Sequence, residues 1–84
     1  MKDKTINKIQ IQLQKLLKEE RIIRNISQEK LSIITGFSQS MISKYESGER
    51  KIGIIELIQI CESLNIKCSD FIKKLESTIM ENKS

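Results

Sequence analysis

The sequence predicts an all-α fold, an expectation that rests on three observations. The 84 residues include no proline and only three glycines, so few positions would interrupt a helix. Isoleucine and leucine recur at intervals of three and four residues along most of the chain, which is the spacing of amphipathic helices. Serine, glycine and asparagine separate these stretches and suit helix ends. The length predicts one small domain over residues 1–84, here built from five helices.

The first helix is expected over residues 5–24. Its apolar positions recur at helical spacing between charged residues, at Leu13, Leu16, Leu17 and Ile23. Asn25 then ends the helix, because asparagine tolerates the left-handed backbone conformation better than most residues do.

Two short helices are expected next, over residues 28–35 and 39–47. Ser27 and Ser38 stand at their N-cap positions, where a serine hydroxyl can accept a hydrogen bond from an unpaired backbone N–H. Gly36 and Gly48 stand where these helices end, since glycine readily adopts the left-handed conformation that closes a helix. Two capped helices joined by one tight turn form a helix-turn-helix at about 27–48, whose second helix can enter the major groove of DNA.

The fourth and fifth helices are expected at about 54–64 and 69–80. Asn65 closes the fourth helix, and Ser69 is expected to cap the fifth. The apolar residues of helices two to four are expected to face the core, and they are Leu31, Ile34, Ile42, Tyr45, Ile54, Leu57, Ile58, Cys61 and Leu64. The fifth helix has an apolar face of Phe71, Ile72, Leu75 and Ile79, which is more than so small a core can cover.

The charge balance suits a polyanionic partner. The formal net charge is +4 and the isoelectric point is about 9.2, and lysine and arginine can neutralise phosphates. No apolar run is long enough to span a membrane, because Gly53 and Glu56 interrupt the run at 52–57. The first twelve residues have no apolar segment typical of a signal peptide, so a cytoplasmic protein is expected.

The cysteines give no sign of a metal site or of catalysis. Cys61 and Cys68 are seven residues apart, and the chain has no histidine, whereas zinc ligands usually come in closely spaced cysteine pairs, often with histidine. No nucleophile with a neighbouring base and no phosphate-binding glycine loop can be identified. We therefore expect no metal, no cofactor and no enzymatic activity.

The segment SQEKLSIITGFSQSMISKYESGERK, at 27–51, resembles the helix-turn-helix of the lambdoid phage repressor and Cro family, also called the XRE family. The fragments SQEKLS, SQSMISKYESGER and IIELIQICESLNI match the family in order, and the resemblance covers about 13–75. It implies a five-helix, lambda-repressor-like DNA-binding domain. Ile52 departs from the family, which often has proline there, and Asn25 departs where glycine is usual.

Four residues of the second helix of this motif are the candidates for contacts with DNA bases. By resemblance they are Gln39, Ser40, Ser43 and Lys44. Glutamine can bond adenine through two atoms and lysine can bond guanine, and the spacing keeps these side chains on one side of the helix. The alternatives remain open: Lys44 suits a phosphate as well as a base, and the other three residues would be unremarkable on a solvated helix.

The candidates for phosphate contacts flank the recognition helix. The resemblance places Ser27 and Gln28 at one phosphate, where the start of a helix offers free N–H groups. It places Ser47, Arg50 and Lys51 on the other side. Arg50 and Lys51 could equally serve only to keep a loop soluble.

The resemblance also implies an ion pair between Arg21, near the end of the first helix, and Glu46, late in the third. Such a pair would fix the recognition helix against the first helix. It is expected to matter for the fold more than for base preference.

The family commonly builds a dimer from its last helix. The expected interface residues here are Phe71, Ile72, Leu75 and Ile79, although Phe71 and Leu75 also suit the core. A frayed apolar tail is the alternative. A symmetric dimer would set two recognition helices about 34–36 Å apart, one turn of DNA.

Two functions compete at this point. The first is a transcriptional regulator, a repressor or controller, that binds double-stranded DNA at a palindromic operator as a homodimer. The second is an antitoxin or adaptor that acts mainly by binding a partner protein. The two overlap, because antitoxins of this fold often also bind their own operator.

Overall fold

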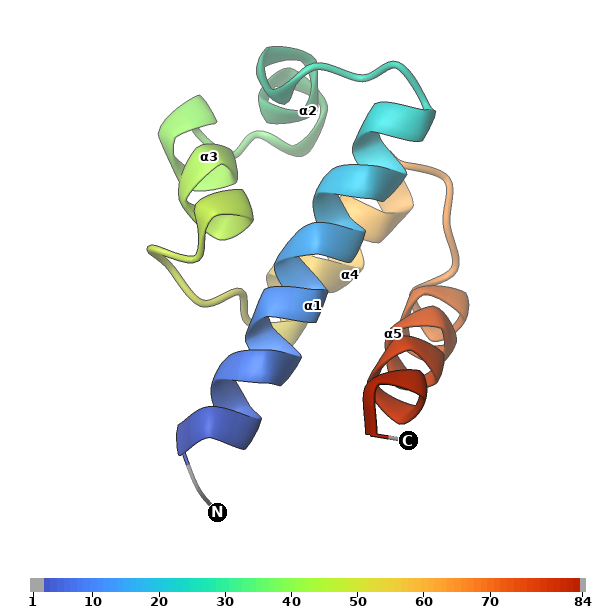
Figure 1. Cartoon of the computed structure of the whole chain (residues 1–84). Helices are drawn as coiled ribbons and strands as arrows, with labels where there is room; N and C mark the ends of the chain where they lie inside the picture. The colour runs from blue at the N-terminus through green and yellow to red at the C-terminus, as the bar shows by residue number, and fades with distance from the viewer. Residues whose placement is uncertain (1–2, 84) are drawn as a thin grey trace.

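The computed structural model describes the backbone of residues 3–83 and the side chains of residues 8–81. Within that range the chain forms five α-helices and no strand, which confirms the predicted fold class (Figure 1). The helices are α1 (Asp3–Ile23), α2 (Gln28–Thr35), α3 (Gln39–Ser47), α4 (Ile54–Ser63) and α5 (Cys68–Lys83). No helix in the described part of the chain is both long and apolar enough to cross a membrane.

The ends of α2 and α3 are set by local hydrogen bonds, as predicted. The Ser27 hydroxyl accepts a hydrogen bond from the Lys30 backbone N–H at 3.0 Å, and Ser38 caps α3 in the same way at 3.1 Å. Gly36 and Gly48 close the two helices with φ of 83° and 87°. Both helices therefore have the bounds expected from the sequence.

The start of α5 differs from the prediction. The helix begins at Cys68, so Ser69 lies inside its first turn and is not the N-cap. The chain turns sharply after α4, because Asn65 adopts a left-handed conformation with φ of 59°. The carbonyl of Lys67 then accepts the first backbone hydrogen bonds of α5. Because this turn is compact, α5 starts at Cys68, before the position expected from Ser69 as its N-cap.

The longest helix, α1, packs between α3 and α5, and α2 and α4 complete the domain (Figure 1). Figure 1 shows α2 and α3 on one side of α1, α5 on the other and α4 behind it. α1 contacts α3 and α5, and α4 contacts α2 and α5. Of the two helices of the helix-turn-helix, α2 therefore packs on α4 and α3 packs on α1.

The buried apolar core consists of Leu17, Leu31, Ile42, Tyr45, Leu57, Ile60, Cys61, Leu64, Phe71 and Leu75. The expectation was wrong for Ile34, Ile54 and Ile58, which are exposed, and it missed Ile60, which is fully buried. On α4 the apolar residues span a wider arc than the side that faces the core, and helical spacing alone does not say which side is covered. α4 turns Ile60 inward and leaves Ile54 and Ile58 at its outer edge.

Glu20 is a buried charged residue that the sequence did not indicate. It is 3% exposed. Its carboxylate accepts hydrogen bonds from Arg24 Nη1 at 2.7 Å and from Lys74 Nζ at 2.8 Å. Because Lys74 belongs to α5, this cluster joins the last helix to the end of α1.

The Glu20 carboxyl has a pKa below its ordinary value of 4.5. Burial acts to raise the pKa, but the hydrogen bonds and charges of Lys74 and Arg24 outweigh it. The folded state therefore holds the Glu20 proton less tightly than the unfolded state does. The stabilisation is fully present above pH 4.5 and is lost as the pH falls through the lowered pKa of the folded state.

We predict that Glu20→Gln flattens the loss of stability at acid pH. The wild type should lose unfolding free energy as the pH is lowered below about 4.5, whereas the variant lacks this titrating group. Urea unfolding at a series of pH values measures the slope. The matched control is Glu19→Gln, because Glu19 is exposed and should keep the wild-type slope. Equal slopes for Glu20→Gln and wild type would contradict the prediction.

Candidate nucleic-acid interface

The outer side of α3 presents all four predicted base-contacting residues. Gln39, Ser40, Ser43 and Lys44 are exposed. Ile42 and Tyr45 lie on the opposite side of the helix and are buried in the core. The structure thus brings the four polar side chains to one solvent-facing surface, which we call the α3 outer face.

The start of α2 holds the first pair of phosphate candidates beside α3. The Ser27 hydroxyl is the N-cap acceptor of α2. Gln28 donates a hydrogen bond from its side-chain amide to Glu46 Oε1 at 3.1 Å. Gln28 is therefore bound to the recognition helix. Sequence reasoning missed this link because it joins residues eighteen positions apart.

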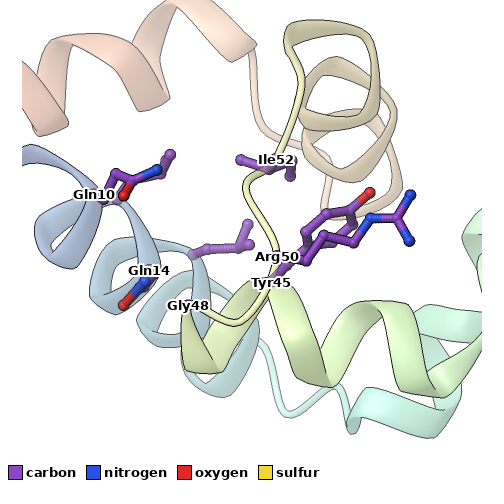
Figure 2. A pocket seen from close by; sticks show the side chains of 8 residues that line it. Gln10, Gln14, Tyr45, Gly48, Arg50 and Ile52 are labelled. Atoms are coloured by element: carbon purple, nitrogen blue, oxygen red, sulfur yellow. The ribbon is translucent and has the colours of Figure 1, made fainter. Parts of the chain in front are cut away.

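The second group of phosphate candidates lies at the other end of α3. The Ser47 hydroxyl donates to the Lys44 carbonyl at 3.3 Å and accepts from the Glu49 backbone N–H at 3.4 Å. The Arg50 guanidinium lies 5.9 Å from the centre of the Tyr45 ring, which is within the range of a cation–π interaction (Figure 2). Lys51 is exposed. Arg50 is thus positioned by α3, while Lys51 extends from the loop.

The predicted ion pair between Arg21 and Glu46 is present. Arg21 donates from Nε to Glu46 Oε2 at 2.6 Å and from Nη2 to Oε1 at 2.9 Å, which is a bidentate geometry. Arg21 Nη1 also donates to the Ile26 carbonyl at 2.7 Å. The Arg21 and Glu46 side chains are only 10% and 4% exposed. One guanidinium therefore joins α1, the α1–α2 turn and α3.

A close contact between α1 and the end of α3 supports the same arrangement. Figure 2 shows Gln14 of α1 beside Gly48, with Ile52 and Tyr45 lining the same small recess. A Cβ atom at Gly48 would lie 2.1 Å from Gln14 Nε2. Glycine is favoured at this position by its left-handed backbone, with φ of 87°, whereas the Gln14 amide is the end of a flexible side chain and could move aside.

The predicted dimer residues on α5 do not share one surface. Phe71 and Leu75 are 1% and 8% exposed and belong to the core of the single chain. They cannot offer area to a partner, which corrects that part of the prediction, because this side of α5 packs against α1 and α4. Ile72 and Ile79 are half-buried and remain candidates.

The two cysteines are unpaired thiols, with Cys61 buried and Cys68 half-buried. Burial, together with the neighbouring Cys68 thiol, raises the pKa of Cys61 to about 12, so its thiol is a poor nucleophile at neutral pH. No group of three or more cysteine, aspartate or glutamate side chains among the described residues is arranged to hold a metal ion.

A family model for the helix-turn-helix matches residues 17–71, well over half of the chain. A solved structure of an XRE-family like protein from Pseudomonas syringae pv. tomato str. DC3000 is 34% identical, covers 89% of this chain and 93% of that chain, and has a TM-score of 0.79. The chain belongs to the XRE family of helix-turn-helix proteins.

Two further solved structures share the fold of this XRE-family chain. The restriction-modification controller protein C.AhdI from Aeromonas hydrophila is 22% identical, covers 74% of this chain and 94% of that chain, and has a TM-score of 0.70. The clp gene regulator ClgR from Corynebacterium glutamicum is 16% identical, with coverages of 89% and 80% and a TM-score of 0.79. No curated protein matches the chain. The family membership supports a DNA-binding transcriptional regulator.

We predict that Glu46→Ala destabilises the fold strongly. Removing one partner of a buried ion pair costs about 3–5 kcal/mol, because the other charge stays buried without compensation. Here Arg21 would lose both of its carboxylate bonds, so the Tm should fall by more than about 10 °C. Thermal unfolding followed by circular dichroism measures the change.

The control for this variant is Glu49→Ala, two residues beyond the end of α3. Glu49 is exposed and forms no side-chain ion pair within the described residues. Its removal should leave the Tm near that of the wild type. A Glu46→Ala protein that melts at the wild-type temperature would show that the ion pair does not hold α3.

Proposed function

We propose that this chain is a sequence-specific, double-stranded-DNA-binding transcriptional regulator that binds a palindromic operator as a homodimer, with α3 in the major groove. The observation that carries the proposal is the α3 outer face. It is polar and exposed along its length, while the bidentate Arg21–Glu46 pair fixes α3 against α1 beside this face and Ile42 and Tyr45 pack into the core on the opposite side. A rigidly held polar helix of this kind fits the major groove.

Within this proposal, Gln39, Ser40, Ser43 and Lys44 contact bases. Gln39 and Ser40 occupy the first turn of α3, and the first residues of a recognition helix reach base edges. Glutamine offers a donor and an acceptor that match adenine in the major groove, and lysine offers donors to guanine. Lys44 lies one turn further on and can reach either a base or a phosphate.

The phosphate contacts flank α3 at both ends. Ser27 and Gln28 lie at the start of α2, where backbone N–H groups and the helix dipole favour an anion. Arg50 and Lys51 supply two adjacent positive charges after α3, and Ser47 lies at the end of the helix beside them. Gln28 would also transmit the position of a phosphate to α3, because it is bonded to Glu46.

The homodimer and the sign of regulation belong to the same proposal. Two copies related by a two-fold axis would read the two halves of a palindrome, with recognition helices about one DNA turn apart. The names of two proteins with this fold, a restriction-modification controller and a clp gene regulator, describe gene control, which favours a repressor or controller. The proposed regulator has no catalytic role and acts in the cytoplasm.

Selection of bound duplexes from a randomised DNA pool, with purified protein at moderate salt, tests the proposal. We expect an enriched two-fold symmetric sequence whose half-sites are about one turn, 10–10.5 base pairs, apart. Enrichment of no sequence, or no binding at all, would favour the antitoxin or adaptor function, and a partner that co-purifies with the protein would support it further.

We predict that Gln39→Ala relaxes the sequence preference at one position of each half-site. A bidentate contact typically discriminates against the wrong base by about 1–3 kcal/mol. The variant should therefore bind the selected duplex more weakly than the wild type does. On a duplex changed at that base pair, the variant and the wild type should bind about equally well. Competition binding with single-base variants of the operator measures this.

The matched control is Lys51→Ala. Loss of a phosphate contact should weaken binding to every duplex alike and lower the salt slope, the change in log K with log salt concentration, by about 1. If Gln39→Ala behaved like Lys51→Ala, with uniform weakening and no change in preference, Gln39 would not be a base-reading residue.

A further inference from the structure

The two cysteines lie at the corner between α4 and α5, and the proposed function uses neither of them. Cys61 belongs to the last turn of α4, and Cys68 is the first residue of α5. The Ile66 backbone N–H donates a hydrogen bond to the Cys61 carbonyl at 2.9 Å, and the Lys67 carbonyl accepts the first backbone hydrogen bonds of α5. These bonds fold the segment between the cysteines into a tight turn.

This turn places the two thiols side by side. Cys68 packs against the buried core cluster to which Cys61 belongs. Burial raises the pKa of Cys61 to about 12, and the adjacent Cys68 thiol adds to that rise through its charge and a hydrogen bond. Neither cysteine is in a disulfide. The corner therefore holds two neighbouring free thiols.

The two thiols differ in their access to solvent. Cys61 is 1% exposed. Cys68 is half-buried and lines an open groove of about 400 Å³ at this corner, beside Glu62 and Lys67. A small solute in the groove can therefore reach Cys68, whereas Cys61 is enclosed by the core.

We propose that Cys68 and Cys61 form a peroxide-sensitive thiol pair, in which hydrogen peroxide oxidises Cys68 and Cys61 then closes a disulfide with it. A solvent-accessible cysteine beside a second, resolving cysteine is the arrangement found in redox-sensing thiols. In a reducing compartment such disulfides are transient, so both thiols are free at rest. The proposed thiol pair goes beyond the proposed function and does not depend on DNA binding.

The proposed oxidation has two steps. The Cys68 sulfur attacks one oxygen of hydrogen peroxide, the O–O bond breaks, and Cys68 sulfenic acid and one water form. The Cys61 sulfur then attacks the Cys68 sulfur, the S–O bond breaks, and the departing hydroxide takes the Cys61 proton and leaves as a second water. The two thiols lose two electrons in all, and one hydrogen peroxide accepts them.

The surroundings of the two cysteines set the order of these steps. The raised pKa keeps Cys61 protonated at neutral pH, so it reacts poorly with a dissolved oxidant. Its fixed position beside Cys68 offsets this disadvantage in the second step, because a held neighbour reacts at a high effective concentration. Cys68 lines the groove through which the peroxide arrives, so it reacts first.

Peptide mapping of the full chain after treatment with hydrogen peroxide tests the proposal. The reduced protein is treated with stoichiometric peroxide, its remaining thiols are blocked with N-ethylmaleimide, and it is digested with trypsin. Cleavage after Lys51, Lys67 and Lys73 places the cysteines in separate peptides, 52–67 and 68–73. We expect these peptides to be joined by a disulfide, in a protein that runs as a single chain on a denaturing, non-reducing gel. All three methionines lie outside both peptides, so their oxidation is measured separately.

Two single-cysteine variants separate the roles of the thiols. Cys61→Ala keeps Cys68 and should accumulate its sulfenic acid, which dimedone traps, without an intrachain link. Cys68→Ser keeps Cys61, whose buried thiol should be lost to peroxide at least about tenfold more slowly than the thiols of the wild type. Far-UV circular dichroism verifies that each variant keeps its helix content, and the peptide map of the wild type requires neither variant.

Three results would overturn the proposed thiol pair: a disulfide that joins two chains in place of one, a Cys68→Ser chain that loses its thiol as fast as the wild type, or both wild-type thiols still free after the methionines have been oxidised. DNA selection with the reduced protein reports on the proposed function alone. Failure of the thiol pair is therefore distinguishable from failure of the proposed function.

Discussion

The position of the recognition helix depends on one bidentate ion pair, between Arg21 and Glu46. α3 has only nine residues, and a helix of that length is not stable in water on its own. Ile42 and Tyr45 pack its inner side into the core. Two hydrogen bonds from a planar guanidinium set its orientation as well, because the carboxylate must match the fork in both position and direction. Burial of two charges costs desolvation energy, so the main gain from this pair is orientation and not net stability.

A second buried carboxylate, Glu20, joins another side of α1 to α5. Glu20 and Arg21 are consecutive, and successive helix positions point about 100° apart, so one reaches toward α5 and the other toward α3. Both clusters recruit a residue that the sequence pattern would leave on the surface, Lys74 in one and Gln28 in the other. The last turns of α1 therefore hold both flanking helices through charged side chains, in a domain whose aliphatic core is too small to fix every helix by packing alone.

The parts of this fold that could be predicted are those decided by neighbouring residues. The caps at Ser27 and Ser38 and the left-handed glycines are local, and α2 and α3 have the bounds expected from them. The start of α5 could not be predicted, because it depends on how tightly the chain turns at Asn65. The exposure of the α3 outer face followed from helical spacing, and the Arg21–Glu46 pair followed from the resemblance. The contacts of Glu20 with Lys74 and of Gln28 with Glu46 join residues far apart in the chain, so no local sequence pattern predicts them.

The apolar residues of α4 show why helical spacing predicted too many buried residues on this helix. A helix whose isoleucines and leucines cover a narrow arc can bury all of them against one neighbour, but those of α4 extend from Ile60 around to Ile55. Within residues 3–83 no further element covers the outer part of that arc, so Ile54, Ile55 and Ile58 stay 62%, 66% and 40% exposed. Helical spacing shows which positions share a side of the helix but not how wide an arc the neighbouring helices cover. On α4 that width is decided by its packing against α2 and α5, which join residues far apart in the chain.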